Sequence, residues 1–264
     1  MYNLVRADLY KVSRSTYIKA LFLISTICAT IMILMAYLIP QGRMNPNFAD
    51  LGLMFSDAHI MSVIGAVTAG ILICGDMNNK VIHDLIASGH SRGKVIISKT
   101  LVLCLVIGFI LLPYAIIVGI GFATGDVFSM VDQSVGFLGL LTDSGKTLTA
   151  SNVLKLVIVM ITLMGVYISQ LSITILLGFK LKKPLYIVGL YYGFGGICAQ
   201  LLLLEGKFPQ FDRLFALTPY GGRHILLTLD TPWTSIIKTI LIIVLYIVVI
   251  VSLTNRLFKK AEIK

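Results

Sequence analysis

Polar and charged side chains that could do chemistry are concentrated in one segment, residues 75–99, which reads GDMNNKVIHDLIASGHSRGKVIISK. We call this segment the polar island. Its chemistry is binding rather than catalysis, since no HExxH or GxSxG motif and no carboxylate pair within an apolar run occurs in the chain. Each charged residue would cost roughly 2.5 to 3.5 kcal/mol at a bilayer centre. The island, although it is flanked by long apolar runs, is therefore expected to lie in water.

Within the island, a short helix over residues 77–90 is predicted. Gly89 supplies its C-terminal stop, Asn78 or Asn79 is a suitable N-cap, and Ser91 can cap the helix that follows. Positions i, i+1, i+4 and i+5 of this helix form one apolar stripe, made of Val81, Ile82, Leu85 and Ile86. Such a stripe can lie on a membrane surface or insert into a groove on another protein.

The composition indicates the class of protein that must position this island. The 264 residues are 57% hydrophobic, and the mean hydropathy is +0.93, which is typical of an integral membrane protein. A net charge of +10 would suggest nucleic acid in a soluble protein, but here membrane topology explains the cations, and no nucleic-acid partner is expected. The four cysteines lie in or beside apolar runs without a CxxC pair, and no metal or other cofactor is expected on this chain.

The apolar runs predict an all-α polytopic membrane protein built as a single domain, residues 1–264. An amphipathic interfacial helix over residues 1–16 precedes the membrane. Six membrane helices are predicted at residues 17–39, 58–75, 95–122, 153–179, 185–204 and 236–253. The polar island with its helix then lies between the second and third of them.

The distribution of basic residues predicts the orientation. Fifteen of the 22 Lys and Arg residues fall in the N-terminal segment, the island, the turn at residues 180–183 and the C-terminal tail. By the positive-inside rule both termini and the island are cytoplasmic, in a multi-pass protein of the cell membrane.

Polar residues elsewhere give weak signals. His59, near the outer end of the second span, is expected to be satisfied or to lie at the level of the lipid headgroups rather than to be a ligand. Gln170, within the fourth span, is expected to be hydrogen-bonded between helices rather than part of a pathway. The run LTDSGKT at residues 141–147 is not a Walker A motif, because five residues rather than four separate Gly139 from Gly145. The span centres are almost free of ionisable residues, which favours an external energy source over ion coupling.

Three stretches resemble the permease subunits of type 2 ABC exporters (the ABC-2 family), notably the small permeases for peptide export, lantibiotic immunity and bacitracin resistance. Residues 4–15, LVRADLYKVSRS, resemble the family's connecting helix through Asp8, Tyr10, Lys11 and Arg14. Residues 81–99 resemble its coupling helix, and residues 218–220, Thr-Pro-Tyr, resemble a motif before the last span. The coupling residues implied by the resemblance are Val81, Ile82, Leu85, Ile86, Ser88, Gly89 and Arg92. The acidic-x-x-x-Gly-Thr often found before that helix departs here to DMNNK at residues 76–80.

The resemblance implies a mechanism and partners. Two copies of a cytoplasmic ATPase subunit, which would bind ATP and magnesium, would drive a pair of permease subunits in the bilayer through the coupling helices. The chain would itself be no enzyme. The substrate implied is amphipathic or hydrophobic, such as a membrane-active or antimicrobial peptide moved outward. The alternative is a non-transporting membrane immunity or sensor protein that binds a peptide, with the island lying on the inner leaflet.

Overall fold

The computed structural model describes residues 1–130, 134–142 and 150–260. These residues form helices and connecting turns without a β-strand, and six of their helices are long and apolar enough to cross a membrane. The predicted fold class, an all-α polytopic membrane protein, is confirmed. In a bilayer a helix satisfies every backbone N–H and C=O group internally, which is why apolar runs of this length adopt it.

Four of the six spans, the second, third, fourth and sixth, extend beyond their predicted apolar runs, and the first and fifth match theirs to within two residues at each end. The six spans are α2 (Thr16–Leu38), α4 (Asp57–Ala69) with its continuations η2 (Gly70–Cys74) and α5 (Gly75–Asn78), α7 (Arg92–Thr124), α9 (Ala150–Leu181), α10 (Pro184–Leu202) and α13 (Trp233–Lys260). Backbone hydrogen bonding continues a helix into its polar flanks, whereas hydropathy marks only the part that suits lipid. The π-helical turn η2 lies within the second span, and a π turn inside a helix is frequently a feature of functional sites.

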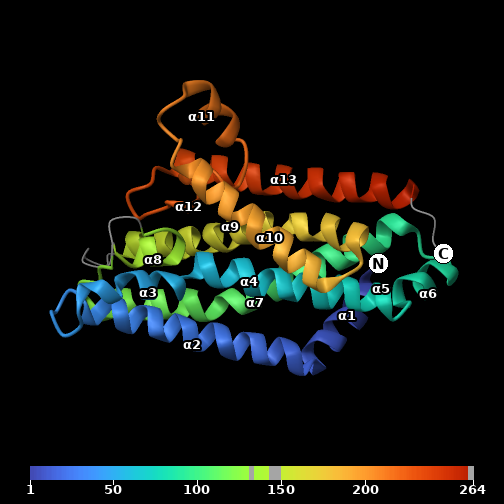
Figure 1. The fold of residues 1–264 in the computed structure, drawn as a ribbon, viewed down its shortest axis with the longest axis horizontal. Coiled ribbons are helices and arrows are strands. Elements are labelled where there is room, and N and C mark those ends of the chain that lie inside the picture. Colours follow the sequence, from blue (N-terminus) through green and yellow to red (C-terminus); the bar gives the residue numbers. More distant parts are fainter. Residues whose placement is uncertain (131–133, 143–149, 261–264) are drawn as a thin grey trace.

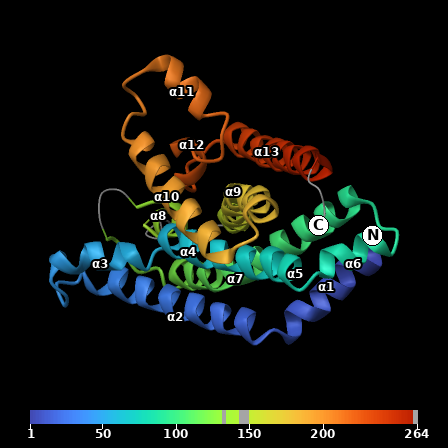
Figure 2. The ribbon, with the colours of Figure 1, turned by 45° about the vertical axis from the view of Figure 1, so that its right-hand side comes forward.

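Helix α9 lies at the centre of the bundle. It packs against α13, α7, α4 and α10, and Figure 2 shows these four helices around it. It is also the most buried of the six spans, whereas α10 and α13 are the least buried. Helix α2 packs on the outer side of α7, where Ser25 donates a hydrogen bond to the carbonyl of Ile110. The core is therefore formed chiefly by α4, α7 and α9.

The short helices gather at the two ends of the bundle (Figure 1). One end, which we call the terminal end, carries α1 (Tyr2–Arg14), α6 (Val81–Ala87) and the last turns of α13. The opposite end carries α3 (Ala49–Met54), preceded by η1 (Pro46–Phe48), together with α8 (Gly136–Leu141) and α12 (Gly222–Ile225). Helix α11 (Pro209–Phe215) projects from the bundle between α10 and α12. Helix α1 occupies most of the range 1–16 predicted for an interfacial helix; it buries Leu4 and packs Val5 and Leu9 against the core.

Candidate functional site

The predicted coupling helix is α6, which is shorter than the expected range of residues 77–90. Neither Asn78 nor Asn79 is its N-cap, because α5 still includes Asn78 and the chain turns at Lys80, whose φ of 59° is left-handed. The helix ends as the sequence predicts. Gly89 has a φ of 90°, its N–H donates to the carbonyl of Ile86, and the next N–H donates to the carbonyl of Leu85, at 3.0 and 3.1 Å. This Schellman motif fixes the C-terminus of α6.

The apolar stripe of α6 faces its own chain. Ile82 is fully buried in the main core, and Leu85 and Ile86 are half-buried against that core. Val81 is also half-buried. Ile82 is therefore already removed from water within the bundle, whereas Val81, Leu85 and Ile86 keep part of their surface. The role of this stripe in coupling to an ATPase stays a prediction. Exposed on α6 and its C-terminal turn are Asp84, Ala87, Ser88 and Gly89.

A cluster of four charged residues joins α1 to the polar island. Lys99 Nζ lies 2.6 Å from Asp8 Oδ1 and 2.5 Å from Asp76 Oδ2, and Lys11 pairs with the other oxygen of Asp76. The side chains of Asp76 and Lys99 are each only 3% exposed. We call these four residues, Asp8, Lys11, Asp76 and Lys99, the charge network. It connects α1 to α5 and α7, and the two halves are 65 to 91 residues apart in sequence.

The other connecting-helix residues lie outside the charge network. Tyr10 is 64% exposed, and the guanidinium of Arg14 stands 5.8 Å from the centre of its ring, which is cation–π geometry. An exposed aromatic and cation on an interfacial helix suit the headgroup region of a bilayer.

Arg92, the first residue of α7, contacts the end of the last span. Its Nη1 donates to the carbonyl of Phe258 at 2.7 Å, and its guanidinium lies 5.5 Å from the centre of the Phe258 ring. Phe258 also packs edge-on against Phe179 near the end of α9, with ring centres 4.8 Å apart. Arg92 therefore links α7 with α13 at the terminal end.

The two residues expected to be structural, His59 and Gln170, each have a hydrogen-bond partner. Ser56 Oγ lies 3.4 Å from His59 Nδ1, and His59 is exposed on α4. Gln170 donates to the carbonyl of Pro219 at 2.8 Å, and the hydroxyl of Tyr220 donates to the backbone carbonyl of Gln170. The predicted Thr-Pro-Tyr segment thus docks on α9. Residues 143–147 of LTDSGKT lie outside the described residues.

Asp57, which the sequence did not single out, is a buried carboxylate at the opposite end of the bundle. It is 0% exposed and accepts hydrogen bonds from the backbone N–H groups of Phe137 and Leu138, at 2.9 and 3.3 Å, and from the Tyr167 hydroxyl. The residue before these donors, Gly136, has a φ of 64°, and a Cβ there would overlap both Asp57 and Tyr167. Asp57 therefore fixes α8 against α4 and α9.

The ionisable groups do not assemble a metal centre in the described part of the chain, where no three His, Cys, Asp or Glu side chains lie close enough to hold an ion. No protein-family model matches the sequence, and no significant match was found among curated proteins.

Proposed function

We propose that the chain is the membrane-spanning subunit of an ATP-driven exporter of the type 2 ABC class, which moves an amphipathic or hydrophobic substrate outward. In this proposal two copies of a separate ATPase bind ATP and magnesium in the cytoplasm, and a second permease subunit completes the pore. The terminal end faces the cytoplasm, as the distribution of Lys and Arg residues predicts.

The observation that carries the proposal is the position of α6 relative to the spans. It follows α4 and α5 with one turn between, and the Gly89 turn leads from it into α7. On either side of α6, Asp76 is paired with α1 through Lys11, and Arg92 is bonded to α13. A force applied to α6 would therefore reach spans two, three and six together with the interfacial helix. A helix that only rests on a leaflet has no need of these connections.

The face that α6 would offer to an ATPase is small and polar. Asp84 and Ser88 are exposed on it, while Ile82 anchors the opposite face in the core. Recognition would then depend on hydrogen bonds and charge at the contact, with the buried stripe transmitting the displacement to the bundle.

Charge reversal on this face tests the proposal against a matched control. Asp84→Lys on α6 is expected to lower the retention of a co-expressed ATPase from the same genome at least about tenfold. Losing a charged contact worth more than about 1.4 kcal/mol weakens binding by at least that factor. Asp50→Lys, which changes another exposed aspartate on α3 at the other end, should leave retention unchanged.

Both variants should insert into the membrane normally, because both aspartates are exposed. Equal loss in both variants, or no loss in Asp84→Lys when the wild type retains an ATPase, would contradict the coupling role of α6. Failure of the wild type to retain any candidate ATPase would instead favour the immunity or sensor function.

A further inference from the structure

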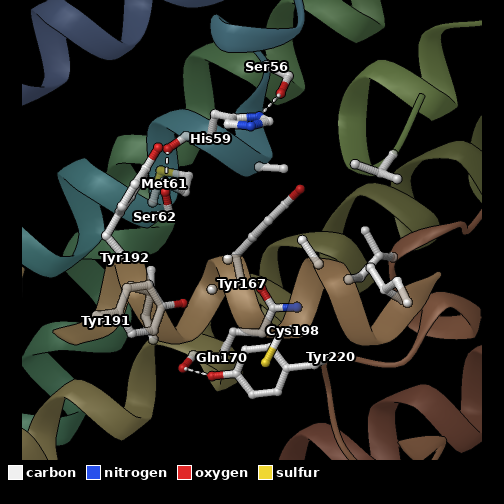
Figure 3. A pocket seen from close by; sticks show the side chains of 18 of the residues that line it. Ser56, His59, Met61, Ser62, Tyr167, Gln170, Tyr191, Tyr192, Cys198 and Tyr220 are labelled. Atoms are coloured by element: carbon white, nitrogen blue, oxygen red, sulfur yellow. Dashed lines mark hydrogen bonds between the residues drawn. The ribbon is translucent and has the colours of Figure 1, made fainter. Parts of the chain in front are cut away.

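A cavity of about 460 Å³ lies in the half of the bundle away from the charge network. Most of its lining residues belong to α4, α9 and α10, and Figure 3 shows several of them around the space. Leu138 of α8 and Ile225 of α12 also line it. Ligand pockets for small molecules have volumes of roughly 300 to 1,000 Å³, so this cavity is large enough for an organic ligand. It does not include any residue of α1 or α6.

Among the described residues that line this cavity there is no Asp, Glu, Lys or Arg. His59 is the one imidazole among these described lining residues. A charged group taken inside would lose its hydration without gaining a counter-ion, which is strongly unfavourable at membrane depth. The buried part of any ligand must therefore be neutral.

The hydrogen-bonding groups around the cavity divide into two sets. Tyr167, Gln170 and Tyr220 are already bonded to protein groups, and these bonds fix the inner wall. His59 and Tyr192 are exposed, and Figure 3 shows Tyr192 extending from α10 toward Ser62 on α4. Ser62 already donates to the His59 carbonyl at 2.6 Å, and its oxygen can still accept. With His59 and Tyr192 it places polar atoms at one edge of a mainly apolar space.

We propose that this cavity binds a neutral amphiphile, a molecule with one apolar chain or ring system that ends in a hydroxyl or amide. The apolar part fills the space beside Met61 and Leu171, and the polar end meets His59, Ser62 and Tyr192. Binding requires neither ATP nor an ATPase, so the site goes beyond the proposed export function and can be tested without it.

The ligand would enter from lipid beside α10. This helix is the least buried of the six spans, and Gly195 and Gly196 on it line the cavity. A Cβ placed on Gly195 would meet no atom within 4 Å, so a side chain can begin there without a clash. Gly189 on the same helix is equally open but does not line the cavity, which makes it a matched control.

Photolabelling of the purified protein tests the proposal. Three diazirine probes with the same alkyl chain would be used, ending in a hydroxyl, a sulfonate or a trimethylammonium group, and the labelled peptides would be identified by mass spectrometry. The hydroxyl probe should label the cavity faces of α4 and α10 at least about tenfold more than either charged probe. A tenfold ratio corresponds to about 1.4 kcal/mol, and burying a charge without a counter-ion costs more than that.

Gly195→Phe should lower this labelling at least about fivefold, because the ring would occupy space that the ligand needs, whereas Gly189→Phe should not. Equal labelling by the three probes would overturn the proposal, and this comparison uses the wild type alone. Labelling that survives in a folded Gly195→Phe protein, or that falls equally in Gly189→Phe, would overturn it as well.

Discussion

Replacement of Asp57 by alanine tests whether this carboxylate holds α8 in place. Asp57→Ala removes the acceptor of three hydrogen bonds, two from the backbone of α8 and one from Tyr167, at a site without solvent exposure. Leaving a buried donor unpaired costs about 1 to 3 kcal/mol, and relief of the buried charge offsets part of the total. We expect a net destabilisation of about 3 to 6 kcal/mol.

Asp57→Asn should have a smaller effect. Its remaining oxygen can stay near Phe137 and Tyr167, and its amide group would then face only the N–H of Leu138, the longest of the backbone contacts at 3.3 Å. Loss of that bond and of the charge should cost about 1 to 3 kcal/mol. We therefore predict that the wild type is the most stable, that Asp57→Asn is less stable and that Asp57→Ala is the least stable.

Thermal unfolding in detergent, followed by circular dichroism, would measure this series. Asp50→Ala, in which an exposed aspartate is removed, should change stability by less than about 0.5 kcal/mol. The reasoning would be refuted if Asp57→Ala unfolded within about 1 kcal/mol of the wild type, or if it matched the Asp50 control. A folded Asp57→Ala protein should also label less well with the hydroxyl probe, because Leu138 of α8 forms part of the cavity wall.

Two further predictions concern the terminal end. Asp76→Asn should destabilise the protein by about 3 kcal/mol, because it leaves the buried Lys99, which is 3% exposed, with Asp8 as its one remaining carboxylate partner. In the same unfolding assay, adding Lys99→Met to Asp76→Asn should restore at least half of the lost stability. Ile82→Ala should cost about 2 to 4 kcal/mol because Ile82 is fully buried, whereas Ser88→Ala on the exposed side should cost less than about 0.5 kcal/mol; equal effects would contradict the inward orientation of the stripe.

The parts of the fold that depend on local chemistry could be predicted from the sequence. A long apolar run in a bilayer has to be helical, so the six spans follow from hydropathy alone. The end of α6 follows from Gly89, because glycine adopts the positive φ of a C-terminal cap with little strain. Both predictions need only residues that are close together in the chain.

The parts that depend on distant residues could not be predicted in this way. Periodicity places Ile82 on a stripe but does not say which surface will cover it, and here that surface is the core of the same chain. Asp57 and Phe137 are 80 residues apart, and Asp76 lies 65 residues from Lys11. A buried carboxylate needs a partner, but only the packing of α4 against α8, and of α1 against the island, determines which partner it finds.

The two ends of the molecule are joined by the second span. Helix α4 contributes His59 and Met61 to the cavity, then passes through η2 into α5 and reaches α6 within two residues. At η2 the span packs closely on its neighbours, since a Cβ on Gly70 would lie 3.1 Å from Pro184 of α10, and Gly178 of α9 is in close contact with Ile73. A displacement of α6 cannot move this span without also shifting α9 or α10, and these two helices form the other walls of the cavity. If an ATPase displaces α6, the shape of the cavity at the other end of the second span should therefore change as well.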